Sequence, residues 1–247
     1  MLELNCLYNQ DCLEGMKEIP DGYFELAIVD PPYGGGATDS ADPRELRGGA
    51  AYWETRARSR FGGLFDKYNI KATRTGGSWS DKYGGKITHW DVAPSPEYFS
   101  ELARVSKNQI IWGGNYFPLP PTRCFVVWRK LTISEGFSMA MCEYAWTSFN
   151  DNSKWIELAP QGTAKEKRIH PTQKPIELYR WLLARYAKKG DKILDTHVGS
   201  ASSLIACHEL GFEYMGFELD PDYFAKATER LERAKAQAIM PLEVSHD

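Results

Sequence analysis

The run Asp30-Pro31-Pro32-Tyr33 combines residue types that can grip a flat polar molecule. It follows an apolar stretch at residues 26–29 and precedes three glycines at residues 34–36. A carboxylate accepts hydrogen bonds, two prolines hold backbone carbonyls in preset directions, and a tyrosine ring can stack on a planar ligand. These residues therefore suit a stiff binding site at the end of a strand. A strand-ending turn with a surface tyrosine is the alternative for the four residues taken alone.

A second group of polar residues follows another strand-like segment near the C-terminus. Residues 192–195 end in Asp195, and Thr196-His197-Val198-Gly199-Ser200-Ala201 then leads into a helical segment. A helix start offers free N–H groups and partial positive charge, which suits a carboxylate or phosphate. Glu218 ends the next strand-like segment, where an acid in a doubly wound fold grips ribose hydroxyls. Because one glycine in such a loop is common, this signal is weak alone.

The elements that would position these groups alternate along the chain. We expect strands at 4–9, 24–30, 109–112, 123–128, 141–149, 192–195 and 214–218. We expect helices at 11–18, 96–106, 175–188, 200–210 and 221–238. This alternation predicts an α/β fold with a doubly wound, mostly parallel, seven-stranded Rossmann-like sheet. No helix separates 123–128 from 141–149, so these strands should form a terminal antiparallel hairpin, followed by a polar loop at 150–169.

A long segment at residues 34–88 interrupts this alternation. It has little periodicity, many glycines, and basic side chains interleaved with aromatic ones. It carries an excess of basic over acidic residues, although the net charge of the whole chain is −3. Segments of this length without regular structure are usually functional or disordered. We therefore expect residues 1–247 to form a single domain with a mobile, substrate-facing insertion at 34–88.

The arrangement of the cysteines indicates a reducing environment, and the hydropathy gives no sign of a membrane-spanning segment. Cys6, Cys12, Cys124, Cys142 and Cys207 are odd in number, scattered, and never in C-x-x-C spacing. This pattern argues against both a disulfide framework and a zinc site. The sequence shows neither a signal-peptide pattern nor an apolar run long enough to span a bilayer. We expect a cytoplasmic protein with no metal and no membrane partner.

A third motif, His170-Pro171-Thr172-Gln173-Lys174-Pro175, completes a set of motifs that resembles a known protein family. With Asp30-Pro31-Pro32-Tyr33, the segment 195–201 and Gly216-Phe217-Glu218, it resembles the amino-type DNA methyltransferases of the permuted β class. In that class the catalytic motif precedes the S-adenosylmethionine motif, as it does here. The tetrad and the hexad are highly specific when they occur together in this order. The resemblance covers roughly residues 9–33 and 95–233 and does not explain the insertion.

The resemblance implies methylation of an exocyclic amine on a DNA base, with S-adenosylmethionine as cofactor. Asp30 and the carbonyl of Pro31 would hold the amine hydrogens, Pro32 would stiffen the turn, and Tyr33 would stack on the base. The target atom is inaccessible in a duplex, so the base would be flipped out. The methyl group would then pass directly to the amine through positioning and electrostatics, without a cysteine nucleophile.

The same resemblance implies a set of cofactor-binding residues. The segment 195–201 would flank the methionine and ribose parts, and Glu218 would bind the ribose hydroxyls. Asp11 would lie near the adenine edge, and residues 172–174 would close over the methionine end. The full set is Asp11, Cys12, Asp30, Thr172, Gln173, Lys174, Asp195, His197, Gly199, Ser200, Ala201, Glu218 and Leu219.

Several of these residues have alternative roles. Asp11 also suits a helix cap, because a helical segment starts there. Lys174 can equally be a surface cation, and Glu218 a solvated acid at a strand end. His170 is expected to fix its loop rather than act as a base, since this chemistry can lose its proton after methyl transfer.

The cofactor loop departs from the family pattern at two places. The family usually shows Asp-Pro-Phe and then Gly-Ser-Gly, whereas this chain has Asp195-Thr196-His197 and Gly199-Ser200-Ala201. The β-carbon of Ala201 is expected to crowd the closest backbone approach. These departures predict weak cofactor affinity, or a pH dependence that comes from His197.

Recognition of DNA is expected to come from the insertion. The interval at 150–169, where the family usually places its recognition region, is short here. The hypothesis is that basic residues of 34–88 contact phosphates and that its aromatic residues stack or wedge at the flipped base. The expected DNA-binding residues are Arg44, Arg56, Arg58, Arg60, Lys67 and Arg74.

The sequence therefore predicts a site-specific DNA adenine-N6 methyltransferase, because Asp at the first tetrad position is more typical of adenine enzymes in the family. Cytosine-N4 methylation is the alternative, and an RNA or protein amide target is more distant. A DNA-binding module with weakened cofactor binding is an alternative of another class. A nicotinamide-dependent oxidoreductase would need a G-x-G-x-x-G turn, which is missing. The expected partner is double-stranded DNA; a homodimer and a cognate restriction endonuclease are further partners to test.

Overall fold

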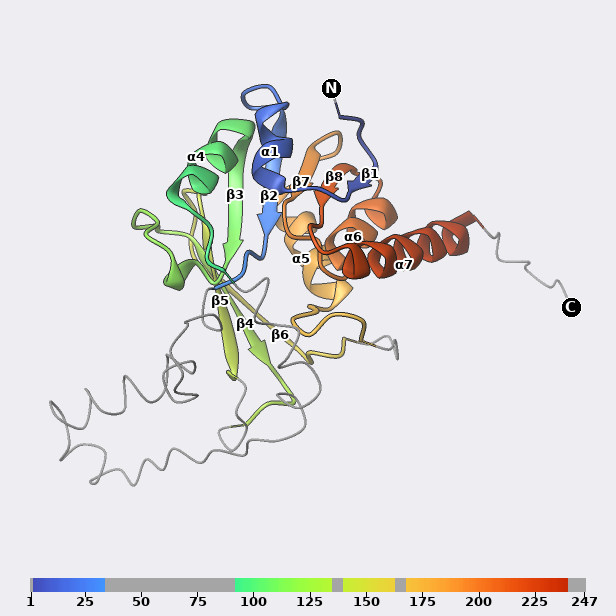
Figure 1. The fold of residues 1–247 in the computed structure, drawn as a ribbon. Coiled ribbons are helices and arrows are strands. Elements are labelled where there is room, and N and C mark those ends of the chain that lie inside the picture. Colours follow the sequence, from blue (N-terminus) through green and yellow to red (C-terminus); the bar gives the residue numbers. More distant parts are fainter. Residues whose placement is uncertain (1, 34–91, 135–139, 163–167, 240–247) are drawn as a thin grey trace, which may run out of the picture. The chain divides into compact units, whose positions relative to one another are not determined.

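The computed structural model describes residues 2–33, 92–134, 140–162 and 168–239 (Figure 1). The chain divides into two units. The first comprises Met1–Pro31, Ser95–Thr132 and Cys142–Asp247, and the second comprises Pro32–Pro94 and Ile133–Met141. The expected mobile insertion at 34–88 lies outside the described residues, so the single-domain organisation stays a prediction.

The first unit is built on a sheet that has eight strands among the described residues, in the order β1-β8-β7-β2-β3-β5-β4-β6. The strands are β1 (Cys6–Tyr8), β2 (Phe24–Val29), β3 (Ser106–Trp112), β4 (Phe125–Lys130), β5 (Cys142–Thr147), β6 (Lys154–Leu158), β7 (Lys192–Asp195) and β8 (Glu213–Phe217). The helices are α1 (Cys12–Lys17), α4 (Pro96–Val105), α5 (Ile176–Tyr186), α6 (Ser202–Leu210) and α7 (Pro221–Ile239), with a 3-10 turn η1 (Gly114–Tyr116). The prediction of a mostly parallel α/β sheet is confirmed.

Strand direction decides which residues meet at the ligand-facing edge. Strands β1, β8, β7, β2 and β3 pair in parallel, and β4 pairs in parallel with β6. Strand β5 runs antiparallel to both of its neighbours, with Ile111 opposite Trp146 and Trp128 opposite Glu143. The carboxyl ends of the parallel strands therefore share one edge with the amino end of β5. In open α/β sheets this edge is where ligands bind.

Two details of the predicted sheet were wrong. The sheet has an eighth strand, β6, inside the interval at 150–169 that we expected to be a polar loop. The β4–β5 hairpin is antiparallel as expected, but β6 lies outside it, so the hairpin is not at the end of the sheet. Strand β6 alternates between exposed and half-buried residues and contains no fully buried residue. A strand with no buried face lacks the apolar pattern that identifies a strand in a sequence.

Local capping explains where two helices begin. The carboxylate of Asp11 accepts hydrogen bonds from the backbone N–H groups of Leu13 (2.8 Å) and Glu14 (3.2 Å), which starts α1. The hydroxyl of Ser95 accepts from the N–H of Tyr98 (3.4 Å), and a proline follows as the first residue of α4. Both caps satisfy backbone donors that have no partner inside the helix. The capping role of Asp11 is therefore present in the structure.

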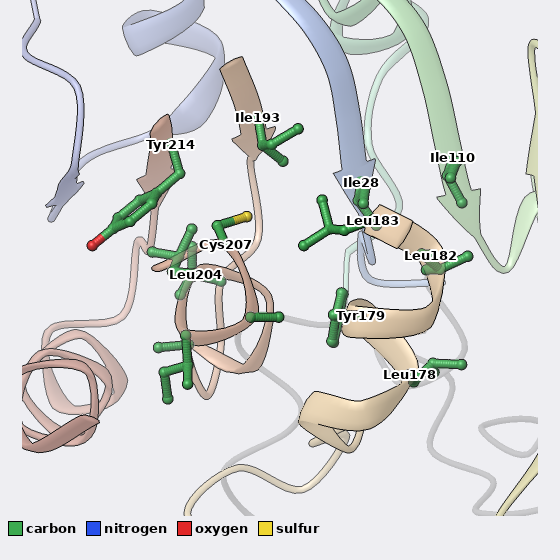
Figure 2. Close-up of a cluster of buried hydrophobic side chains, with 14 of the residues drawn as sticks. Ile28, Ile110, Leu178, Tyr179, Leu182, Leu183, Ile193, Leu204, Cys207 and Tyr214 are labelled. Carbon is green, nitrogen blue, oxygen red and sulfur yellow. The ribbon is translucent and has the colours of Figure 1, made fainter. Parts of the chain in front are cut away.

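The helices after β6 cover the sheet with apolar side chains. Helix α5 packs against α6, and α6 packs against α7 (Figure 1). Figure 2 shows how α5 and α6 direct buried side chains toward those of the strands, among them Ile28, Ile110, Leu178, Tyr179, Leu182, Leu183, Ile193, Leu204 and Cys207. Burying each large apolar side chain contributes about 1.5–3 kcal/mol. This packing fixes the segment before α5, which carries Lys174, against the sheet.

None of the helices in the described ranges combines the length and the apolar character that a membrane crossing requires.

Candidate functional site

Acidic side chains occupy the ends of three neighbouring parallel strands. Asp30 follows β2, Asp195 ends β7 and Glu218 follows β8. Burial, reinforced by the negative charges of Asp30 and Glu218, raises the pKa of Asp195 to about 7. Burial also raises the pKa of Glu218. The edge therefore concentrates negative charge in a poorly solvated place, where a cationic group would be stabilised.

The loop at 196–201 is held between two of these carboxylates. Asp195 accepts hydrogen bonds from the N–H of His197 (3.0 Å) and from the hydroxyl of Ser203 in α6. Glu218 accepts from the N–H of Gly199 (2.8 Å). Gly199 has a positive φ of 54°, and a β-carbon there would lie 3.4 Å from the ring of His170. These hydrogen bonds hold the loop, and Gly199 allows its close approach to His170.

Ala201 adopts a backbone conformation that alanine rarely takes. Its φ is 62°, in the left-handed region. This conformation costs an L-residue other than glycine about 1–2 kcal/mol. Arg230, which is buried, braces the turn by donating to the carbonyl of Ser200 (2.6 Å). The methyl group of Ala201 itself is buried in the hydrophobic core, which offsets part of the strain.

Substitution of Ala201 should separate strain from packing. Ala201→Val should lower the free energy of unfolding by about 2–4 kcal/mol, because a β-branched residue is disfavoured at positive φ and overfills a packed core. Ala201→Gly should stay within about 1 kcal/mol of the wild type, because relief of strain is offset by a lost methyl contact and a more flexible unfolded chain. Urea denaturation measures both values. Equal stability of the two variants would contradict the strained conformation.

His197 links the loop at 196–201 to α4 and α1 through a chain of polar groups. The hydroxyl of Tyr98 lies 2.6 Å from that of Thr196, which lies 2.9 Å from Nδ1 of His197. On the other side, Nε2 of His197 lies 4.0 Å from the sulfur of Cys12. Burial lowers the pKa of His197 to about 4 and raises that of Cys12 to about 12. Both groups are therefore neutral near pH 7, and titration of His197 falls well below the neutral range.

The loop at 170–175 is organised by His170. Its ring packs edge-on against Tyr223 (4.3 Å between centroids), and its Nδ1 accepts from the N–H of Thr172 (3.3 Å). Burial lowers the pKa of His170 to about 3, so the imidazole is neutral. The side-chain oxygen of Gln173 accepts from the N–H of Ile169 (3.0 Å). These contacts hold the loop together, which agrees with a structural role for His170.

Lys174 is not a surface cation. It is 4% exposed, and its ammonium forms ion pairs with the carboxylates of Asp30 and Glu143 (3.1 Å to the latter). Glu143 is paired in turn with Lys130, which is also buried. We call Asp30, Lys174, Glu143 and Lys130 the charge cluster. Sequence reasoning placed Lys174 over a cofactor, and it missed Lys130 and Glu143 altogether.

Electrostatics keep the centre of the charge cluster ionised. Burial opposes the charge of Glu143, but the ammonium groups of Lys174 and Lys130 outweigh it and lower the pKa of Glu143 to about 2. Burial likewise opposes the charge of Lys174, and the carboxylates of Asp30 and Glu143 raise its pKa. The ring of Trp112 lies 5.2 Å from the Lys174 ammonium, and that of Trp128 lies 5.3 Å from the Lys130 ammonium. Aromatic faces attract such cations.

The remaining predicted residues have mixed placements. Pro31 is buried in the first unit, whereas Pro32 and Tyr33 belong to the second. Leu219 is 63% exposed beside Glu218, and Asn9 donates to the carbonyls of both. The predicted DNA contacts, all between residues 34 and 88, lie outside the described residues. Within the described ranges, no group of three His, Cys, Asp or Glu side chains is arranged to hold a metal ion.

Comparisons with known proteins match this architecture. Residues 111–229 match the N6/N4 family model described as DNA methylase. The type II methyltransferase M.HpaI of Haemophilus parainfluenzae is 35% identical over 68 residues, which cover 28% of this chain and only 22% of that protein.

Two solved structures share the fold across most of the chain. The M1.HpyAVI–SAM complex has a TM-score of 0.52 at 16% identity, covering 92% of this chain and 98% of that one. The PvuII DNA methyltransferase, described as cytosine-N4-specific, has a TM-score of 0.53 at 11% identity, covering 93% and 89%. At sequence identities this low, the structural similarity supports only a shared fold.

Proposed function

Because residues 111–229 match the N6/N4 DNA methylase family model, we propose that the chain is a site-specific DNA methyltransferase that methylates an exocyclic base amine with S-adenosylmethionine. The observation that carries the proposal is the place of Asp30. This carboxylate lies at the carboxyl end of the central strand β2, on the edge that also carries Asp195 and Glu218.

The donor set at this edge fits a cationic nucleoside cofactor. Burial raises the pKa of Asp195 to about 7, and the negative charges of Asp30 and Glu218, which a positive ligand would compensate, add to this effect. Glu218 accepts two backbone N–H bonds, and a carboxylate has about four acceptor positions, so it retains capacity for ribose hydroxyls. When bound, S-adenosylmethionine would supply an electrophilic methyl group on a positively charged sulfur.

Asp30 would act on the target amine. The lone pair of an exocyclic amine is delocalised into the base, which makes the nitrogen a poor nucleophile. The Asp30 carboxylate and the Pro31 carbonyl would accept its two hydrogens and free the lone pair. In a direct transfer, the amine nitrogen would form the new bond to the methyl carbon, and the electron pair of the broken sulfur–carbon bond would stay on sulfur. The surplus proton of the nitrogen then passes to the Asp30 carboxylate or to water.

The proposed target is adenine N6, because the first residue of the tetrad is aspartate. Cytosine N4 is the alternative, since its amine presents the same two hydrogens to Asp30 and Pro31. The insertion at 34–88 is proposed to make the contacts with double-stranded DNA through its basic residues. A cytoplasmic location, a homodimer and a cognate restriction endonuclease stay predictions.

Mass spectrometry of DNA nucleosides tests the proposal. The purified protein is incubated with S-adenosylmethionine and duplex DNA of mixed sequence, and the DNA is then digested. We expect N6-methyladenine from the wild type and at least about 100-fold less from Asp30→Ala. Only 4-methylcytosine would overturn the choice of base. DNA binding without any methylation, and without cofactor binding in calorimetry, would replace the enzyme by a DNA-binding module.

A further inference from the structure

The charge cluster unites side chains from four separate elements at the ligand-facing edge. Asp30 follows β2, Lys130 ends β4, Glu143 is the second residue of β5, and Lys174 precedes α5. Buried ion pairs are rarely better for stability than apolar residues of similar size. Perturbed titratable groups gathered in one place are more often part of a functional site. Three of these four residues have no role in the mechanism above.

The contacts alternate in sign from one side of the cluster to the other. Lys130 pairs with one carboxylate oxygen of Glu143, and Lys174 pairs with the other oxygen at 3.1 Å. Lys174 also pairs with Oδ2 of Asp30. The exposed fractions of the lysine side chains are 7% for Lys130 and 3% for Lys174. Little water reaches these ammonium groups, so the carboxylates must balance their charge.

The ammonium group of Lys174 affects Asp30 in two opposing ways. Lys174 stabilises the negative charge of Asp30 in a poorly solvated place, and it also competes with a target amine for the oxygens of that carboxylate. Glu143 offers Lys174 a second partner, and Lys130 keeps Glu143 charged and in place. The two ammonium groups rest on the rings of Trp112 and Trp128, which are themselves in an edge contact (6.3 Å between centroids). The ammonium of Lys174 thus contacts both carboxylates: it donates a hydrogen bond to Asp30 and lies 3.1 Å from an oxygen of Glu143.

We propose that Glu143 is a positioning residue for methyl transfer, which shares Lys174 with Asp30 and so keeps the Asp30 carboxylate available to the target amine. This inference rests on the proposed function. Without Glu143, Lys174 would pair fully with Asp30, and an incoming amine would have to displace it. Glu143 therefore acts through Lys174 and touches no substrate. Lys130 supports the same arrangement from the far side.

Other titratable groups that interact with the charge cluster are either neutral near pH 7 or present unchanged in every variant. They are Tyr98 in α4, His170 before α5, Tyr179 in α5 and Asp195 in β7. Burial holds the pKa of both tyrosines well above the ordinary value and lowers that of His170 to about 3. Burial raises the pKa of Asp195 to about 7, and the charges of Asp30 and Glu218 add to this effect. A change in titration between variants therefore reports on the cluster.

The test is Glu143→Gln, which keeps the shape of the side chain and removes its charge. We expect kcat to fall about tenfold at saturating DNA and cofactor, with the KM for S-adenosylmethionine within about twofold of the wild type. Lysine NMR with 13Cε labelling should show a lower pKa for Lys174, because one of its two carboxylates is gone. Glu143→Asp should recover most of kcat and most of the Lys174 titration. A purely structural role predicts neither the titration change nor this recovery.

Two further variants control for folding and for surface charge. Lys130→Met/Glu143→Gln removes one charge of each sign and should lose as much kcat as Glu143→Gln, with a stability nearer to the wild type. Glu157→Gln breaks an exposed ion pair between β6 and Arg129 in β4 and should change neither kcat nor the Lys174 titration. Wild-type kcat in Glu143→Gln, or a loss confined to KM, would overturn the inference. If the wild type methylates no DNA, the proposed function is overturned. Separately, an unchanged pKa of Lys174 in Glu143→Gln would refute the sharing of Lys174 between Asp30 and Glu143.

Discussion

Asp30→Ala is expected to reduce methyl transfer to DNA by about 100- to 1,000-fold, with cofactor affinity within about threefold of the wild type. The substitution removes the carboxylate that would hold an amine hydrogen and localise the lone pair on nitrogen. Asp195 and Glu218, which are proposed to bind the cofactor, remain in place. Transfer of a tritiated methyl group measures the rate, and calorimetry with S-adenosylmethionine measures the affinity.

The control for Asp30→Ala is Glu232→Ala on the exposed surface of α7. Glu232 is 61% exposed and pairs only with Lys235 among the ion pairs within the described ranges, so its loss should leave the rate unchanged. Circular dichroism should verify that Asp30→Ala is folded, because Lys174 loses one of its carboxylates. A rate above about a tenth of the wild type would rule out Asp30 as the main acceptor.

Lys174→Met is expected to lower the free energy of unfolding by about 3–5 kcal/mol at pH 7, because it leaves the carboxylates of Asp30 and Glu143, whose side chains are 13% and 22% exposed, without their shared cation. Urea denaturation measures the difference. Lys17→Met is the matched control: Lys17 is 47% exposed in its pair with Glu14, and its loss should leave the free energy of unfolding close to that of the wild type. If Lys174→Met lowered the free energy of unfolding by less than about 1 kcal/mol, this would contradict the dependence of Asp30 and Glu143 on the Lys174 ammonium.

The cost of Lys174→Met should depend on pH in one direction. The pKa of Glu143 is lowered in the folded protein to about 2, against about 4.3 in an unfolded chain. The stability from its pairing is therefore complete above about pH 4.3 and disappears as the pH falls toward 2. The gap between wild type and Lys174→Met should narrow over this window. A gap that stays constant down to pH 2 would contradict the charge on Glu143.

The fold could largely be predicted because most strands have buried faces. Residues 24–29 and 192–195 are short apolar runs in the middle of the sheet, and their sequences show it. The helix start at Ser95 could be predicted because capping depends on neighbours in sequence. Strand β6 was missed for the opposite reason. Its sequence, Lys-Trp-Ile-Glu-Leu, lies at the edge of the sheet, and the exposed Trp155 gives no sign of a core.

Only those residues of the candidate site that belong to sequence motifs were predicted. Asp30, Asp195 and Glu218 follow apolar runs, so their position at the ends of strands is readable from the sequence. Glu143 and Lys130 sit in strands among polar residues, where a charged side chain suggests solvent. Their burial depends on the register that places Trp128 opposite Glu143 and on a helix that starts more than 30 residues later. No local pattern encodes such a meeting.

The place of β2 has a consequence for the order in which the protein is made. Strand β2 lies between β3 and β7, so one of its edges pairs with residues 106–112 and the other with residues 192–195. A ribosome adds about 5–20 residues per second, so the second edge stays bare for several seconds after the first can close. Asp30 likewise waits for Lys174. A nascent chain halted between these points would present one unpaired edge of the central strand, a surface to which other chains can pair.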